Sequence, residues 1–114
     1  MRVYGLKTCD TVARARRWLD AAGLVHEFHD FRRDGLPPAL LDAWIDAVGW
    51  EALVNRRGTT WRQLGPAARD AVCDAASAKR LMLEQPSVIK RPVIEWPGRT
   101  ITVGYDEQRY AELS

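Results

Sequence analysis

The chain has 114 residues, of which 46% are hydrophobic and 28% charged, and its net charge is +2. This composition is typical of a soluble globular protein, and the charge is far from that of a dedicated nucleic-acid binder. No apolar run approaches the roughly 20 residues that span a bilayer, and no apolar signal segment follows Arg2. We therefore expect one cytoplasmic domain with a sizeable core, no membrane binding and no direct nucleic-acid binding.

The first third of the chain has a strand–helix–strand pattern. Residues 2–6 predict a strand, residues 10–22 predict a helix that ends at Gly23, and residues 25–31 predict a second strand. The predicted apolar face of the helix consists of Val12, Ala15, Leu19 and Ala22. Because such a unit crosses over with right-handed geometry, we expect the two strands to be parallel.

The middle of the chain is predicted to be helical. Helical segments are expected at residues 38–48, 50–55, 66–75 and 77–84. The first has a proline, Pro38, in its first turn and a glycine, Gly49, at its end, and Ser77 is the expected cap of the last. The polar and glycine content of residues 55–65 predicts an exposed loop.

The final third of the chain predicts two strands and a helix. Residues 92–96 and 99–103 predict a hairpin, because Trp96-Pro97-Gly98-Arg99 places proline and glycine where a type II turn needs them. Asp106 is a suitable N-cap for the last helix. The predicted order is therefore β-α-β, a helical insert at about residues 37–85, and β-β-α, which defines an α/β fold with a mixed sheet.

Cys9 lies where the first strand ends and the first helix begins. Backbone N–H groups at a helix start have no intrahelical partner, and the helix dipole places partial positive charge there, so a thiolate is favoured. Lys7 adds positive charge nearby, and Thr8, Asp10 and Thr11 are candidates to cap the turn. The alternative is a buried cysteine that acts as a small hydrophobe. The polar flanking residues favour the reactive thiol.

Several motifs together resemble a known family. The segment Tyr4-Gly5-Leu6-Lys7-Thr8-Cys9-Asp10-Thr11 resembles the opening of the arsenate reductase/Spx family of thioredoxin-like proteins, in particular its YffB-like, ArsC-related branch. Matching motifs follow in order along nearly the whole chain, at Phe28-His29-Asp30-Phe31, Gly49-Trp50-Glu51-Ala52-Leu53, Asn55-Arg56-Arg57-Gly58-Thr59-Thr60-Trp61 and Ile89-Lys90-Arg91-Pro92. The resemblance implies a single thioredoxin-like domain over residues 1–114 with a helical insert between its halves.

The resemblance also implies which residues form the site. It implies that the peptide before Pro92 is cis and lies beside the reactive cysteine, so that Arg91 stabilises the thiolate or binds an anion. The alternative for Arg91 is an arginine at a strand end that faces water. The arginines of residues 55–62 suit an anion such as the carboxylates of glutathione, or they form a solvated surface. The expected catalytic residues are Cys9 and Arg91, and the expected substrate-binding residues are Lys7, Thr8, Asn55, Arg56, Arg57 and Pro92.

The activity that the resemblance implies is glutathione-dependent thiol–disulfide reduction through one cysteine. Position 12, where a Cys-x-x-Cys pair has its second cysteine, is Val12. We therefore expect glutathione to resolve a mixed disulfide on Cys9 as a co-substrate, without a bound cofactor. The other partner is expected to be a small-molecule or protein disulfide.

Two alternative functions follow from the same resemblance. Arsenate reductases of this family hold the oxyanion with three arginines, and Asn55, Arg91 and Val103 stand at the matching places here. Arg56 or Arg57 is a candidate to replace the first arginine. Spx-like regulators bind RNA polymerase without turnover, but they commonly carry the Cys-x-x-Cys pair that this chain lacks.

Cys73, His26 and His29 are the remaining residues with chemically versatile side chains, and none of them is expected to form a reactive or metal site. Cys73 lies in an alanine-rich stretch and is expected to be a small buried residue, with a resolving thiol as the alternative. His26 and His29 stand three apart in a predicted strand and face opposite sides of it. No Cys/His/Asp cluster offers a better ligand set, so no metal site is expected.

Overall fold

The computed structural model describes residues 1–114, which divide into two compact units. The sheet unit consists of Met1–Gly35 and Arg91–Ser114, and the helical unit consists of Leu36–Lys90. The helical unit extends beyond the insert expected at 37–85. The reason is that Pro86–Val88 form a short 3-10 helix, η1, and that Ile89 forms a β-bridge with Val54.

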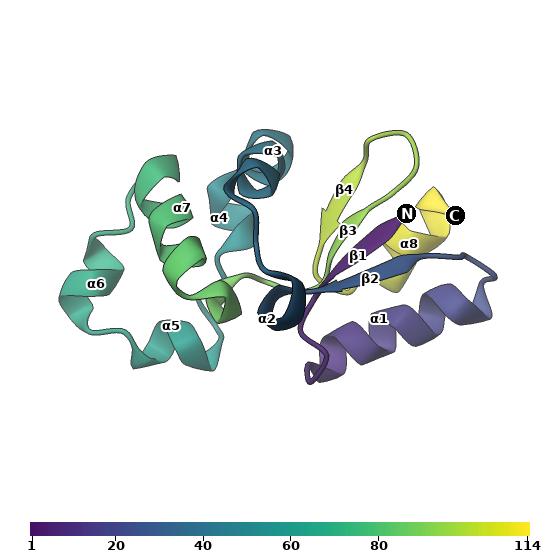
Figure 1. The fold of residues 1–114 in the computed structure, drawn as a ribbon, viewed down its shortest axis with the longest axis horizontal. Helices are drawn as coiled ribbons and strands as arrows, with labels where there is room; N and C mark the ends of the chain where they lie inside the picture. The colour runs from purple at the N-terminus through teal and green to yellow at the C-terminus, as the bar shows by residue number, and fades with distance from the viewer. The chain divides into compact units, whose positions relative to one another are not determined.

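The sheet unit contains a four-stranded mixed sheet with the order β2-β1-β3-β4 (Figure 1). The strands are β1 (Arg2–Gly5), β2 (Glu27–Asp30), β3 (Val93–Glu95) and β4 (Ile101–Val103). β1 is parallel to β2 and antiparallel to β3, and β3 is antiparallel to β4. The mixed sheet and the parallel first pair confirm the fold class predicted from the sequence.

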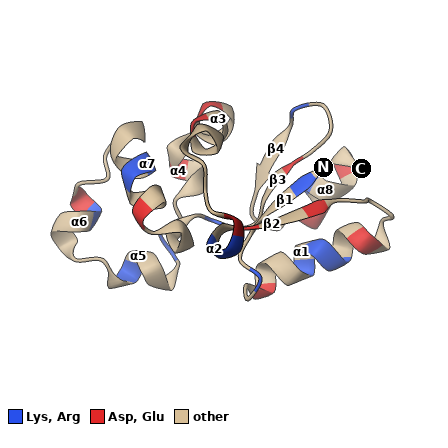
Figure 2. Ribbon diagram, in the orientation of Figure 1, with Lys and Arg blue, Asp and Glu red and all other residues tan.

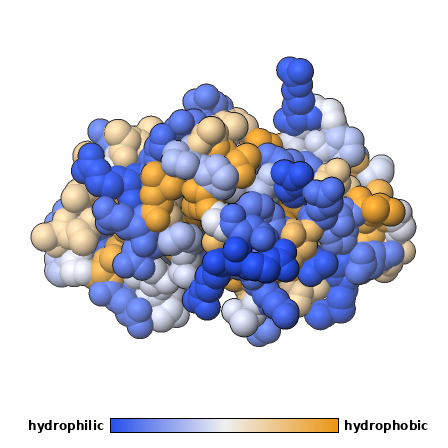
Figure 3. Space-filling model, viewed as in Figure 1, coloured by the Kyte–Doolittle hydropathy of each residue, from blue (hydrophilic) through white to orange (hydrophobic).

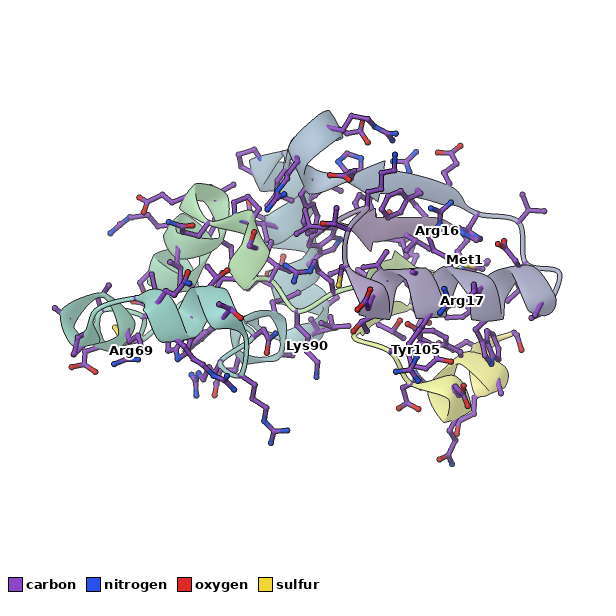
Figure 4. The ribbon with its side chains drawn as sticks, turned by 90° about the horizontal axis from the view of Figure 1, so that it is seen from below. Met1, Arg16, Arg17, Arg69, Lys90 and Tyr105 are labelled. Atoms are coloured by element: carbon purple, nitrogen blue, oxygen red, sulfur yellow. The ribbon has the colours of Figure 1, made fainter.

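Two helices of the sheet unit, α1 (Asp10–Ala21) and α8 (Glu107–Leu113), pack against the same face of the sheet. The core between them consists of Val3, Ala15, Leu19, Ile94, Trp96 and Tyr110. Figure 4 shows Tyr105 next to α1 and α8, and the guanidinium of Arg14 lies 4.9 Å from the centre of its ring. Asp106 caps α8 by accepting a hydrogen bond from the N–H of Arg109, as predicted.

The other face of the sheet carries Tyr4 and Val93, which are paired in the β1–β3 register. Both side chains are fully buried. The hydroxyl of Tyr4 donates a hydrogen bond of 2.8 Å to Glu95, and its ring lies 4.9 Å from that of His29.

The helical unit is formed by short helices that are joined by tight turns. They are α3 (Pro38–Val48), α4 (Trp50–Leu53), α5 (Thr59–Gln63), α6 (Pro66–Asp70) and α7 (Ala75–Glu84). An ion pair of 2.8 Å joins Lys79 on α7 to Asp42 on α3. Gly49 ends α3 with a φ of +84°, a conformation that glycine adopts without strain.

Several predicted boundaries in the two units are wrong. The segment 55–65, expected to be a loop, contains α5. The second strand ends one residue earlier than predicted, because Asp30 caps a short helix, α2 (Phe31–Asp34). Ala22 is exposed, since the helix ends at Ala21 and Gly23 turns the chain with a φ of +73°.

The environment predicted for Cys73 is also wrong. Cys73 is exposed and lies outside any helix, because α6 ends at Asp70 and α7 begins only at Ala75. Asp74, rather than Ser77, is the N-cap of α7. Ser77 completes a capping box, in which the Asp74 side chain accepts from the Ser77 N–H and the Ser77 hydroxyl accepts from the Asp74 N–H.

Charged side chains are spread over both units, and α1 carries several arginines between acidic residues at its two ends (Figure 2). On the face shown in Figure 3, hydrophilic residues cover much of the surface and hydrophobic residues appear as separate patches. None of the helices combines the length and the apolar character that crossing a membrane requires.

Candidate active site around Cys9

Cys9 is the N-cap residue of α1, with an extended backbone at φ −84° and ψ 122°. Its N–H donates to the carbonyl of Leu6 at 3.0 Å, which closes the turn after β1, and its own carbonyl accepts from the N–H of Ala13. No side-chain oxygen caps the helix, contrary to the expectation for Thr8, Asp10 and Thr11. The thiol therefore stands at the place where a capping oxygen is usually found.

Gly5 allows the first turn of α1 to lie close to the end of β1. A Cβ atom at Gly5 would lie 2.6 Å from Cγ2 of Val12, well inside van der Waals contact. Any larger residue at position 5 would push this turn away from the strand. The backbone of Val12 takes part in the site, as its N–H interacts with the Cys9 thiol.

The strand register brings Arg91 to Cys9. β1 and β3 are antiparallel with Tyr4 opposite Val93, so the carboxyl end of β1 and the amino end of β3 meet at the same edge of the sheet. The Arg91–Pro92 peptide bond is cis, as the family resemblance implies. The carbonyl of Pro92 accepts a hydrogen bond of 2.9 Å from the N–H of Gly104 at the end of β4.

The surroundings of Cys9 stabilise its thiolate form. Partial burial is the largest single influence and raises the pKa of the thiol. The N–H of Val12, the hydrogen bond and charge of the Arg91 side chain, and the N–H of Thr11 all act in the opposite direction, and together they leave the pKa of Cys9 below its usual value. This direction agrees with the expectation from the sequence.

Lys7 and Thr8 lie in the same turn as Cys9, and both are exposed. The backbone of Lys7 is held by Asp30, whose carboxylate accepts its N–H at 2.9 Å. Asp30 is not among the site residues expected from the sequence, although it lies in the motif Phe28-His29-Asp30-Phe31. The available signal was an aspartate between a predicted strand and a short polar segment, which is typical of an N-cap.

Asn55, Arg56 and Arg57 belong to the helical unit, where they line an open cavity of about 520 Å³. We call this cavity the basic pocket. Its lining consists of Glu51, Ala52, Val54, Asn55, Arg56, Arg57 and Lys90. The labelled Lys90 in Figure 4 belongs to this unit. Three cations against one carboxylate give the pocket a positive balance that suits an anionic ligand.

The shape of the basic pocket depends on Asn55. The Asn55 side chain accepts a hydrogen bond of 3.2 Å from the N–H of Arg57, and a Cβ atom at Gly58 would lie 2.9 Å from its amide nitrogen. The guanidinium of Arg56 lies 5.7 Å from the ring centre of Trp50 and 5.9 Å from that of Trp61. Asn55 therefore orders the turn, and the two indoles fix the direction of Arg56.

The predicted site residues thus fall into two groups. One group lies at one edge of the sheet unit and consists of Lys7, Thr8, Cys9, Arg91 and Pro92. The other group belongs to the basic pocket of the helical unit and consists of Asn55, Arg56 and Arg57. Cys73 belongs to the helical unit and forms no disulfide.

A mixed four-stranded sheet with a cysteine at the start of its first helix and a cis-proline directly before β3 defines a thioredoxin-like fold. The chain belongs to the ArsC family, which matches residues 4–113. An uncharacterized protein of Haemophilus influenzae is 40% identical over 108 residues, which are 95% of this chain and 93% of that protein. Membership of the family supports a thiol-dependent, reductase-like role.

Two solved structures agree with this assignment. A protein named YffB is 44% identical, with a TM-score of 0.91 over 98% of this chain and 96% of its own. An arsenate reductase (ArsC) related protein from Brucella melitensis is 46% identical, with a TM-score of 0.77 over 97% of this chain and 91% of its own. Both similarities extend over nearly the whole chain, so they include the sheet unit and the helical unit.

Proposed function

We propose that the protein is a glutathione-dependent thiol–disulfide reductase that works through a single cysteine. The observation that carries this proposal is the environment of Cys9, where Arg91 and the N–H groups of α1 lower the pKa of a half-buried thiol. Thiolates are the species that attack disulfides, so a lowered pKa increases the reacting fraction at neutral pH. Val12 stands where a second redox cysteine would be, so a thiol from outside the motif must complete the cycle.

The reaction consists of two thiol–disulfide exchanges. In the first, the Cys9 thiolate attacks one sulfur of the substrate disulfide, a mixed disulfide forms on Cys9, and the other sulfur leaves as a thiolate. In the second, the thiolate of glutathione attacks the mixed disulfide and releases the Cys9 thiolate. When the substrate is a glutathionyl disulfide, the products are the reduced thiol and oxidised glutathione, and the two electrons come from glutathione.

Glutathione as the co-substrate is supported by the charges that line the basic pocket. Glutathione carries two carboxylates and one ammonium group. Arg56, Arg57 and Lys90 are suitable partners for the carboxylates, and Glu51 is suitable for the ammonium. We therefore assign the binding of the charged groups of glutathione to this pocket.

Arsenate reduction is the second candidate, and family membership is the observation that favours it. Two features weigh against it. Val103, at the place of one expected arginine, pairs with Val93 in the sheet and is uncharged, and Asn55, at the place of another, uses its side chain to order its own turn. An oxyanion site without these charge-assisted bonds loses about 1.5–3 kcal/mol for each.

The proposed function is tested by a glutathione-coupled assay with a small neutral disulfide. Wild-type protein and Cys73→Ser are expected to turn over substrate at equal rates, because Cys73 is exposed and takes no part in the two exchanges. Cys9→Ser is expected to show only the uncatalysed rate. Turnover by Cys9→Ser at the wild-type rate, or none by the wild type, would refute the proposal.

A further inference from the structure

Asp30 is the only charged residue of the chain that is buried, with 7% of its surface exposed. Burial disfavours a charged carboxylate unless hydrogen bonds compensate for the lost water. Asp30 accepts three backbone N–H groups, from Lys7 at 2.9 Å, Arg32 at 2.8 Å and Arg33 at 3.3 Å. Despite burial, the pKa of Asp30 is lowered by these N–H groups, so the group is a carboxylate at neutral pH.

The two oxygens of this carboxylate have different partners. Oδ1 accepts the N–H groups of Arg32 and Arg33 and thereby caps α2. Oδ2 accepts the N–H of Lys7, which belongs to the turn that carries the thiol. Capping a four-residue helix accounts for Oδ1 alone, so the second oxygen has a separate role in the turn.

The hydrogen bond to Lys7 restricts the position of Cys9. Gly5 is fixed by its register with Asp30 in the parallel β1–β2 pair, and the N–H of Cys9 is bound to Leu6. The hydrogen bond from the Lys7 N–H to Asp30 fixes Lys7, which lies between Gly5 and Cys9. The turn from Leu6 to Cys9 is therefore held to β2 as well as to β1, and its freedom to carry the thiol away from the N–H groups of Thr11 and Val12 is reduced.

We propose that Asp30 is a positioning residue that holds the turn of Lys7 and thereby keeps the Cys9 sulfur against Arg91 and the first N–H groups of α1. This inference rests on the proposed reactivity of Cys9. It makes Asp30 act through the backbone, without contact with the substrate.

The sign of a pKa change separates this role from two others. Asp30→Asn removes a negative charge, and a purely electrostatic role predicts that the pKa of Cys9 falls. Loss of positioning predicts that the pKa of Cys9 rises. The side-chain amide in Asp30→Asn would have one acceptor oxygen, which cannot accept both the N–H of Lys7 and the N–H groups at the start of α2. A role in overall stability alone predicts no change while the protein is folded.

The test is the rate of Cys9 alkylation by iodoacetamide against pH, in the Cys73→Ala background so that one thiol reacts. Asp30→Asn is expected to slow alkylation at pH 7 several-fold and to move the inflection to higher pH, with an unchanged far-UV circular dichroism spectrum. Asp34→Asn is the matched control, since the Asp34 carboxylate pairs with Arg33 and accepts the Asp30 N–H, whereas the N–H of Lys7 is accepted by Asp30. An inflection that is unchanged or lower in Asp30→Asn overturns the proposal.

A second measurement uses the unaltered protein and does not depend on the folding of a variant. In an NMR titration to low pH, the amide proton of Lys7 is expected to shift as the Asp30 carboxylate that accepts it is protonated, with a midpoint below the ordinary pKa of an aspartate. A Lys7 amide that does not follow Asp30 overturns the proposal. Neither experiment uses glutathione, so a failure here is distinguishable from failure of the proposed function.

Discussion

Arg91 hydrogen-bonds to the thiol of Cys9, although the two residues lie in the last and first quarters of the sequence. The antiparallel pairing of β1 with β3 produces this proximity, because Tyr4 stands opposite Val93, Cys9 follows the end of β1 and Arg91 precedes the start of β3. The positive charge beside the sulfur has two opposed effects on reactivity. It increases the thiolate fraction, and it decreases the intrinsic nucleophilicity of that thiolate.

Arg91→Ala is expected to raise the pKa of Cys9 towards the free-cysteine value of about 8.5 and to slow its reaction at pH 7. At pH 7 the decrease in the thiolate fraction slows the reaction more than the higher nucleophilicity of each thiolate speeds it, because the Brønsted slope is only about 0.4–0.5. Above both pKa values the mutant should equal or overtake the wild type with a small neutral disulfide. The measurement is a pH–rate profile in the Cys73→Ala background.

Arg91→Lys is the control for this profile. A lysine retains positive charge and loses the planar, bidentate donor geometry of arginine, so a partial restoration of the lowered pKa is expected. Profiles of both variants that superimpose on that of the wild type would show that Arg91 does not act on the thiol.

Substitutions in the basic pocket are expected to weaken glutathione binding without changing the thiol. Arg57→Ala and Lys90→Ala should each raise KM for glutathione by roughly 10- to 100-fold, as expected for loss of a charge-assisted bond of about 1.5–3 kcal/mol. The rate with an uncharged thiol such as 2-mercaptoethanol should stay unchanged. Arg80→Ala removes an exposed arginine of α7 that does not line the pocket and is the matched control. If Arg57→Ala and Lys90→Ala had the same KM for glutathione as Arg80→Ala, the pocket would be excluded from glutathione recognition.

The sequence predicts the sheet unit well, because its elements carry strong local signals. The apolar stripe of Val12, Ala15 and Leu19 defines α1, and all three residues are buried. The Pro97-Gly98 pair defines the hairpin turn, in which Gly98 has a φ of +84°. The additional positive φ of 68° at Arg99 has no signal in the sequence, since it arises from closing the loop with a bond from Trp96 to Thr100.

The helical unit is predicted less well, because α4, α5 and α6 are too short for periodicity to show. α5 has five residues and contains no buried residue, so its sequence resembles a loop, and α6 ends at Asp70 although a helix is predicted over residues 66–75. Cys73 is wrongly predicted to lie in a helix, because the alanine-rich sequence around it favours helix and does not show that α6 ends at Asp70 and α7 begins after the N-cap Asp74. The hydrogen bond between the Lys7 N–H and Asp30 depends on the register of β2 against β1, which local sequence does not specify.

Arsenate reduction is expected to be slow or absent. Val103 and Asn55 replace two arginines that the family resemblance implies for the oxyanion, and neither side chain carries charge. The measurement is glutathione-coupled arsenate turnover by the purified protein, with the neutral disulfide assay run in parallel as a control for activity. Robust arsenate turnover would contradict the expectation and would direct attention to Arg56 and Arg57 as replacements.

Asp106→Ala is expected to lower the free energy of unfolding by about 0.5–2 kcal/mol, the usual cost of an N-cap. The cap bond to Arg109 is lost, and α8 holds Tyr110 in the core of the sheet unit. Urea unfolding measures the change, and the alkylation profile of Cys9 should remain that of the wild type. A wild-type midpoint would show that α8 does not depend on its cap.

In the proposed mechanism, Cys9 alone forms a mixed disulfide that glutathione then resolves. Intact-mass measurement after incubation with oxidised glutathione tests it most directly, with wild type, Cys9→Ser and Cys73→Ser compared at pH 7. At short times, wild type and Cys73→Ser are expected to gain the mass of one glutathionyl group, Cys9→Ser is expected to gain none, and reduced glutathione should remove the adduct. If Cys9→Ser gained an adduct as fast as the wild type, or if reduced glutathione did not remove the adduct from Cys9, the mechanism would be wrong.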